Sequence, residues 1–334
     1  MRYTRAMRRL SPLSLGTAVA VSLCLAVSAA SGVEEAPMIP PEQASATIAE
    51  NGRAIVRHLA ETIGPRSLFN PPSLEEAARY IEERLAELGY AVESQPYEAP
   101  GGHTVRNLIV EKTGREKPDE IILFGAHYDT VPSTPGADDN ASGVAGLLEL
   151  ARLLKSYENR RTIRLVAFTC EEPPYFHSRW MGSRVYAREA RRRGDDIIAM
   201  VSIEMIGFFD ASISQTFPVP FMSYFYPSTA DFIGVVGNLS SRRLVTAVRE
   251  AMRRGGDIGV ESITAVRLVP GIDFSDHASF WREDYPAVMV SDTAFYRSPH
   301  YHGPSDTPDT LNYESFAEVV RGLYQAILEL DEGE

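Results

Sequence analysis

Cysteine is scarce in this sequence: its 334 residues include only two, Cys24 and Cys170. A small disulfide-stabilised fold needs several cysteine pairs, so that class of protein is excluded. The chain also lacks the composition of a disordered protein, because 44% of its residues are hydrophobic and 23% are charged. We therefore expect a large packed core, with core packing or bound metal supplying the stability.

An excess of positive charge is absent as well. Lys and Arg total 33 against 45 Asp and Glu, which gives a formal net charge of −12. Surfaces that bind nucleic acid are basic, because they must contact phosphates. We therefore expect no nucleic-acid partner.

After the first thirty residues the chain has no further apolar run long enough to span a membrane. Those residues hold four arginines and an apolar stretch that ends in small residues: Arg2, Arg5, Arg8, Arg9, Leu10–Ala26 and 27–30. This pattern predicts a signal peptide over 1–30, a periplasmic or secreted protein, and no stable membrane insertion after cleavage. A retained membrane anchor and lipidation of Cys24 are the alternatives. The oligomeric state is not predicted.

A single domain over 42–334 is expected after a linker over 31–41 that contains Pro37, Pro40 and Pro41. The domain begins with helices within 42–89, predicted at Glu42–Ile63 and at Ser73–Leu88. Ser73 is the expected cap of the second helix, and Gly89 ends it.

Apolar runs typical of buried strands then alternate with helical patterns. The predicted strands are Asn107–Glu111, Glu120–Ala126, Thr162–Thr169, Ile197–Ile203, Phe232–Val236 and Ala287–Ser291. The predicted helices are Ser142–Tyr157, Gly182–Arg193, Ser240–Arg254 and Tyr313–Leu330. This alternation predicts an α/β fold with a mostly parallel central sheet and helices on both faces.

Acidic and histidine side chains follow the predicted strands at the points where the strands end. Carboxyl ends of parallel strands meet at one edge, where ligands of such sheets bind. The side chains are His127, Asp129, Asp139, Glu171, Glu172, Glu204 and His302. Carboxylates that converge repel one another, so a divalent cation is required. Mixed imidazole and carboxylate ligation fits zinc, with manganese or cobalt as alternatives.

Seven short motifs carry a resemblance to a known family. In chain order they are Gly125–Thr130, Gly136–Gly143, Cys170–Glu172, Met181–Arg184, Glu204–Gly207, Ser275–His277 and Tyr301–Thr307. Together, over about residues 40 to 330, they resemble the M28 family of zinc peptidases. The resemblance implies the zinc-exopeptidase fold, a peptide substrate and two zinc ions.

The resemblance also assigns roles to individual residues. It implies that His127 and Glu204 hold one ion, that Glu172 and His302 hold the other, and that Asp139 bridges the two. The peptide bond after Asp139 is expected to be cis. Asp129, two residues beyond His127, is placed to accept the ring N–H of that histidine.

Two further residues receive catalytic roles from the family. Glu171 matches the general base that moves a proton from water to the leaving amine. Tyr301 matches a tyrosine that donates a hydrogen bond to the developing oxyanion, with aromatic packing as the alternative role.

The chain departs from the family at two places. Glu204 stands where the family commonly has Asp, and an insertion follows Glu172 over 173–180. Asp276 and His277 are expected to form hydrogen bonds at the rim of the site. The aromatic segment 208–226 is expected either to form the wall of an apolar pocket or to cover an edge of the sheet.

These features predict an exported zinc aminopeptidase. The alternatives are a glutaminyl-peptide cyclase, a carboxypeptidase that uses Arg267 or Arg297 to hold the substrate carboxylate, and a catalytically silent binding ectodomain.

Overall fold

The computed structural model describes residues 41–333, so the expected signal peptide and the linker up to residue 40 lie outside the described residues. The helices are α1 (Pro41–Arg57), α2 (Pro71–Glu87), α3 (Gly143–Leu154), α4 (Gly182–Arg193), α5 (Arg242–Gly255), α6 (His277–Trp281) and α7 (Tyr313–Glu332). The short helical turns are η1 (His58–Ile63), η2 (Ala137–Ser142), η3 (Pro220–Tyr224), η4 (Ala294–Tyr296) and η5 (Pro308–Thr310). No helix in this described range is both long and apolar enough to cross a membrane.

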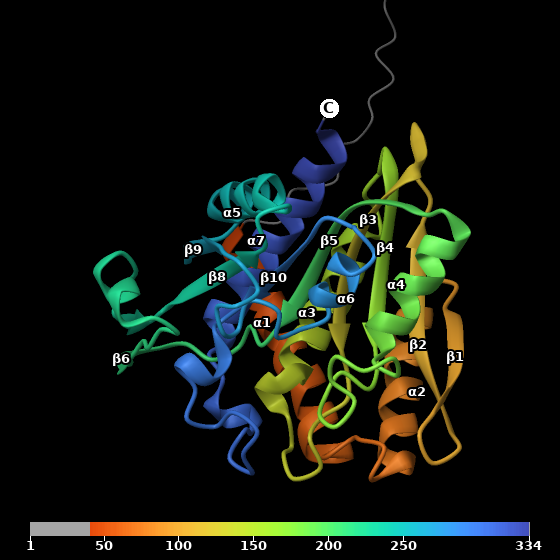
Figure 1. Cartoon of the computed structure of the whole chain (residues 1–334), viewed down its shortest axis with the longest axis horizontal. Coiled ribbons are helices and arrows are strands. Elements are labelled where there is room, and N and C mark those ends of the chain that lie inside the picture. Colours follow the sequence, from red (N-terminus) through yellow and green to blue (C-terminus); the bar gives the residue numbers. More distant parts are fainter. Residues whose placement is uncertain (1–40, 334) are drawn as a thin grey trace, which may run out of the picture. The chain divides into compact units, whose positions relative to one another are not determined.

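The strands form one large sheet and a separate two-stranded ribbon (Figure 1). They are β1 (Glu93–Ala99), β2 (His103–Lys112), β3 (Lys117–His127), β4 (Arg161–Phe168), β5 (Asp196–Glu204), β6 (Asp210–Ser214), β7 (Thr229–Ala230), β8 (Phe232–Gly237), β9 (Gly259–Thr264) and β10 (Ala287–Ser291). The large sheet has the order β1-β2-β4-β3-β5-β10-β8-β9, and β6 pairs with β7.

The centre of the large sheet is parallel. Strands β4, β3, β5 and β10 run in one direction, β2 and β8 join them antiparallel on either side, and β9 runs parallel to β8. The mostly parallel α/β sheet predicted from the sequence is confirmed. Because the four central strands share a direction, their carboxyl ends lie at the same edge.

Helices cover both faces of this sheet, as predicted. α1, α2, α3, α5 and α7 contribute to one apolar core, and α4 and α6 contribute to the other. Strand β3 shows why the central strands have continuous apolar sequences. Its Ile122 and Phe124 belong to the first core, whereas Ile121 and Leu123 belong to the second. A strand buried on both faces needs apolar side chains at every position.

The sequence prediction was wrong at the start of α2 and missed four strands and one α-helix. Helix α2 begins at Pro71, so Ser73 lies inside its first turn. Proline fits the first helical positions because the N–H that it lacks has no partner there. The missed strands are β1, β6, β7 and β9, and the missed helix is α6. β1 and β9 are edge strands with largely polar sequences, and α6 has only five residues.

The end of α7 is fastened to the start of β4 by one buried carboxylate. Asp331 accepts hydrogen bonds from the backbone N–H groups of Arg160 and Arg161 at 2.9 and 2.6 Å, and from the Tyr157 hydroxyl at 2.7 Å. Arg161 in turn donates to the carbonyl groups at the end of α7. These hydrogen bonds join the C-terminal end of α7 to β4 of the large sheet.

We expect Asp331→Asn to lower the free energy of unfolding by about 2–3 kcal/mol, because an amide group leaves buried donors without an acceptor. Asp309→Asn is the matched control. Asp309 pairs with Arg57 on the surface and its side chain is 75% exposed, so the change should stay within about 0.5 kcal/mol. Urea unfolding of both variants measures the difference. If both variants lose the same free energy of unfolding, the hydrogen bonds of Asp331 contribute no more stability than the exposed ion pair of Asp309.

Candidate metal centre

Three neighbouring strands deliver the predicted metal ligands to one edge of the sheet. His127 is the last residue of β3 and Glu204 is the last residue of β5. Glu171 and Glu172 follow β4 within four residues of its end. Asp139 lies in η2, directly before α3. Elements that are far apart in the sequence therefore meet where the parallel strands end.

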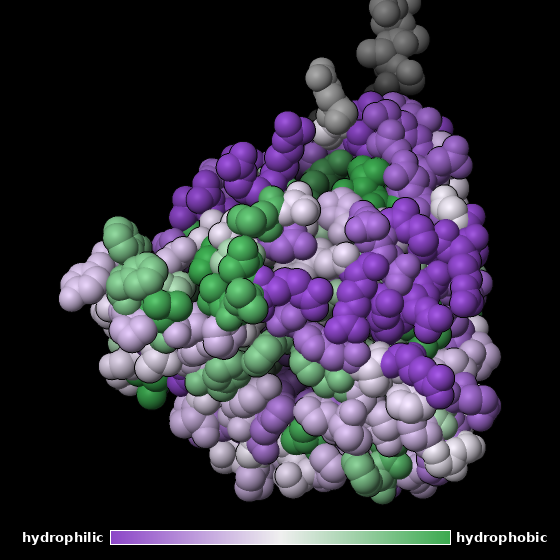
Figure 2. Space-filling model, viewed as in Figure 1, coloured by the Kyte–Doolittle hydropathy of each residue, from purple (hydrophilic) through white to green (hydrophobic). Residues whose placement is uncertain are grey.

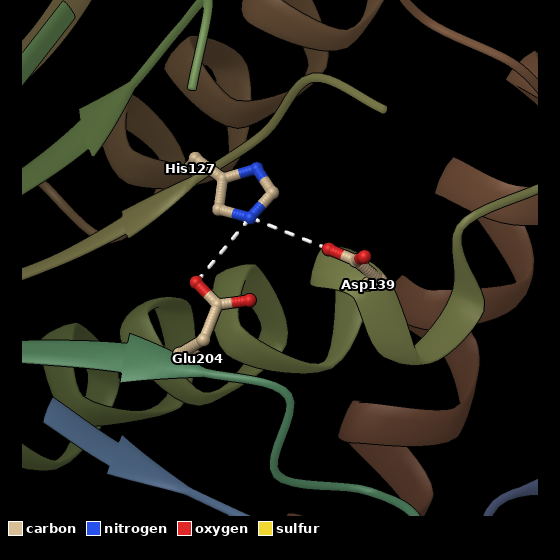
Figure 3. Close-up of side chains that lie close together, drawn as sticks. All are labelled: His127, Asp139 and Glu204. Atoms are coloured by element: carbon tan, nitrogen blue, oxygen red, sulfur yellow. Dashed lines mark ion pairs between the residues drawn. The ribbon is translucent and has the colours of Figure 1, made fainter. Parts of the chain in front are cut away.

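The first ligand group consists of His127, Asp139 and Glu204 (Figure 3). Nε2 of His127 lies 3.4 Å from Oδ1 of Asp139 and 3.4 Å from Oε2 of Glu204. All three side chains are buried and point toward one another.

The second ligand group consists of Asp139, Glu172 and His302. Nε2 of His302 lies 3.2 Å from Oδ2 of Asp139 and 3.2 Å from Oε2 of Glu172. Asp139 thus presents one carboxylate oxygen to each group. Its peptide bond to Asn140 is cis, as the resemblance implies.

Unpaired buried atoms indicate that these groups suit a cation. His127 Nε2 and Glu172 Oε1 are buried and form no hydrogen bond within the described residues. Buried polar atoms normally have a bonding partner. A bound metal ion would be the partner of each of these two atoms. Imidazole nitrogens and carboxylate oxygens are zinc ligands. The residues present therefore fit zinc.

Burial of so much acidic charge changes the proton affinities of the site. Burial and the neighbouring charge of Asp139 together raise the pKa of Glu172 to about 8. Burial lowers the pKa of His302, but hydrogen bonds to Asp139 and Glu172 outweigh this and raise it to about 10. Without a cation, protons must balance the charge of the cluster. A bound cation takes over that role.

The backbone around the ligands is fixed by carboxylates that accept N–H groups. Asp129 accepts from the backbone N–H of Glu171 at 3.0 Å and from that of Glu172 at 3.1 Å. His127 Nδ1 lies 3.1 Å from the backbone carbonyl of Asp129 and 3.6 Å from its carboxylate. The ring contact predicted for the Asp129 carboxylate is therefore made by its carbonyl.

Asp306 performs the same task for the shared ligand. It accepts from the backbone N–H groups of Asp138 at 2.8 Å and Asp139 at 3.1 Å. Asp306 lies within one of the seven motifs, but no sequence pattern assigns it this role.

Arg66 is a further residue that sequence reasoning missed. It is 0% exposed and donates to five carbonyl groups, those of Leu59, Gly64, Tyr128, Pro135 and Gly136. It therefore fixes both ends of the loop that connects His127 with η2. No local sequence pattern reveals it, because its acceptors are backbone atoms, three of them more than sixty residues away.

Glu204 has its own support from the segment that contains Asp276. The hydroxyl of Ser275 donates to Oε2 of Glu204 at 2.7 Å. Asp276 and His277, the residues expected to form hydrogen bonds at the rim of the site, are completely buried. His277 lies in α6, and its Nε2 is 2.7 Å from the Ile272 carbonyl. The short helix α6 begins directly after Asp276.

Two residues beside the ligand groups are available for chemistry. Glu171 belongs to neither group, and its Oε2 lies 3.9 Å from Nε2 of His127. The Tyr301 ring stacks on His302 at 3.8 Å between ring centroids. Burial and the surrounding carboxylates raise the pKa of Tyr301, so its hydroxyl stays protonated.

A pocket with an empty volume of about 850 Å³, including its open mouth, begins at Glu204 and Tyr301. Most of its lining is apolar. Phe217, Met222 and Tyr226 form part of it, so the aromatic segment does form a pocket wall. His177, in the insertion, bonds the Asp273 carbonyl at 2.8 Å and belongs to neither ligand group.

The sheet carries two ligand groups at its carboxyl edge, each made of carboxylates and one imidazole. This combination of fold and site is that of a zinc peptidase. Residues 107–327 match the profile of peptidase family M28. The chain is 44% identical over 277 residues to the uncharacterized protein YfbL of Escherichia coli K12, covering 80% of this chain and 84% of that protein. The chain belongs to peptidase family M28, as its motifs predict.

Solved structures share the fold. BSAP, a zinc aminopeptidase from Bacillus subtilis, gives a TM-score of 0.68 at 16% identity, over 84% of this chain and 95% of that one. The glutaminyl cyclase of Bacteroides thetaiotaomicron, solved with N-acetylhistamine, gives 0.62 at 19% identity, over 84% and 97%.

We expect zinc affinity to rise with pH between about 6 and 9. His302 carries a proton below its pKa of about 10 in the metal-free protein, and zinc needs the neutral ring. Each proton released changes the apparent affinity about tenfold per pH unit. Competition with a chelator at several pH values measures this.

Two variants complete the test. His302→Ala should flatten the pH dependence, whereas His300→Ala, outside both groups, should preserve it. If the zinc affinity of the unaltered protein does not change with pH, His302 does not carry the proton assigned to it in the metal-free protein.

Proposed function

We propose that this chain is an exported aminopeptidase that uses two zinc ions. Asp139 would bridge the ions, with His127 and Glu204 holding one and Glu172 and His302 holding the other. Support for two ions comes from the two oxygens of Asp139, each of which faces a different ligand group. Export rests on the signal-like sequence of residues 1–30 alone.

Bound zinc would polarise the substrate carbonyl and lower the pKa of a coordinated water. Glu171 takes the proton from the attacking water and delivers it to the leaving amine. The hydroxyl of Tyr301 donates a hydrogen bond to the oxygen on which negative charge develops. Asp129 and Ser275 hold Glu171 and Glu204 in position through the hydrogen bonds described above.

The charge of the pocket is the observation that favours an aminopeptidase over a carboxypeptidase. A carboxypeptidase needs a cation for the terminal carboxylate of its substrate. No Lys or Arg is among the described residues that line the pocket. Arg267 pairs with Asp273, and the buried Arg297 donates to Gln215. Neither arginine lines the pocket, whereas the carboxylates of the ligand groups suit an N-terminal ammonium group.

We expect Glu171→Gln to keep its zinc and lose activity by a factor of about 10² to 10⁴, because the amide cannot accept the proton. Elemental analysis of the purified variant and its kcat on a peptide substrate measure both properties. Glu283→Gln, a carboxylate that pairs with Arg184 away from the site, is the control and should keep full activity. Normal turnover by Glu171→Gln would rule out its role as the base.

Blocking the two ends of a peptide separates the candidate activities. Acetylation of the N-terminus should abolish release of amino acids, and amidation of the C-terminus should leave it unchanged. The reverse result would favour a carboxypeptidase. Ring closure of an N-terminal glutamine without hydrolysis would favour the cyclase. No turnover of any of these peptides by the zinc-loaded protein would favour the binding ectodomain.

A further inference from the structure

One row of residues crosses four strands of the sheet at the floor of the pocket. Glu204 on β5 pairs with Ser291 on β10, Ser291 pairs with Gly234 on β8, and Gly234 pairs with Glu261 on β9. All four residues line the pocket. The row therefore begins at a candidate zinc ligand and ends at a second carboxylate.

The middle of this row is open because its residues are small. Gly234 has no side chain, and a Cβ there would lie 3.3 Å from the Ser291 carbonyl oxygen. Strands lie about 4.8 Å apart, so Glu204 and Glu261 are separated by about 14 Å between their backbones. The gap between the two carboxylates suits a long side chain lying across Ser291 and Gly234.

The walls of the gap are aromatic. Phe217, Tyr226 and Phe232 line it, and the rings of Phe217 and Tyr226 lie 5.8 Å apart. The Tyr226 hydroxyl donates to the Ser262 carbonyl at 3.0 Å, which fixes the ring beside β9. Such walls suit the methylene stem of Lys or Arg, and ring faces also attract its charged head.

Glu261 is available to a cation. Its side chain is 31% exposed, and it accepts no hydrogen bond from the described part of the chain. The nearest cation is Arg253, 4.0 Å away, which donates instead to the Val260 carbonyl. Arg297 lies behind the Phe232 ring, 4.7 Å from its centroid, and does not line the pocket. Glu204 and Glu261 are the only charged residues among the described pocket lining.

We propose that the pocket selects peptides that begin with lysine or arginine, and that Glu261 determines this specificity. The N-terminal residue lies with its backbone at the metal centre, and its side chain crosses Ser291 and Gly234 to reach Glu261. This proposal rests on the aminopeptidase activity proposed above. In Figure 2, hydrophobic residues gather on the side of the molecule where Figure 1 shows β6, β8 and β9.

Fluorogenic aminoacyl amides of lysine, norleucine, arginine and citrulline test this specificity, because each neutral residue has nearly the shape of its charged partner. We expect the unaltered enzyme to favour each charged residue by about tenfold or more in kcat/KM. Glu261→Gln should reduce that preference to about twofold or less while leaving kcat/KM for norleucine within about twofold. Unchanged norleucine turnover shows that the variant is folded.

Glu250→Gln is the matched control. Glu250 lies on α5, also 4.0 Å from Arg253, but outside the pocket, so the preference should remain. Glu261→Lys should make the charged substrates poorer than the neutral ones.

Three results would overturn the proposal. The unaltered enzyme could favour norleucine and citrulline, the preference could survive Glu261→Gln, or Glu250→Gln could abolish it equally. In these cases neutral substrates are still cleaved, so the aminopeptidase function stands. An enzyme that cleaves none of the four amides overturns both proposals.

Discussion

Repulsion among buried carboxylates is the constraint on which this structure depends. Three parallel strands end beside one another, and their ends bring Glu204, Glu171 and Glu172 to one place together with Asp139. Water is largely excluded there, so the charges are weakly screened. Counter-charge is therefore required, from protons on the two histidines or from metal ions. The rest of the site keeps these groups from moving apart.

That restraint comes mainly from hydrogen bonds to the backbone. Asp129, Asp306 and Arg66 bind N–H or carbonyl groups of the segments that carry the ligands. Just after two of these strands the backbone adopts a positive φ. The angle is 54° at Cys170, after β4, and 49° at Met205, after β5. Such angles are uncommon for residues other than glycine and concentrate at functional sites. The ligand positions are thus determined by the chain rather than by the metal alone.

The predictable parts of the molecule are those with a local sequence signal. Strands such as β3 and β5 are buried on both faces and are therefore continuously apolar, and residues at their ends could be identified as ligands. The edge strand β9 has no such pattern, although it supplies Glu261. Arg66 and Asp306 act on backbone atoms distant in sequence, which no spacing rule reveals. The complete burial of Asp276 could not be predicted either, because burial of a polar residue depends on the packing of α6.

The strand order also places the pocket beside the ligand groups. Strands β10, β8 and β9 extend the sheet on the Glu204 side, so the pocket floor continues directly from the metal centre. The aromatic segment after β5 folds over this extension and forms a wall. Under the proposed specificity, a side chain bound on that floor would lie in fixed register with the ligands, which would place the adjacent peptide bond beside Glu171.

The most direct test of this account is a crystal structure of the zinc-loaded protein with anomalous diffraction recorded at the zinc absorption edge. The account predicts two peaks about 3.5–4 Å apart, one on each side of the Asp139 carboxylate. A single peak, or peaks away from Asp139, would contradict it.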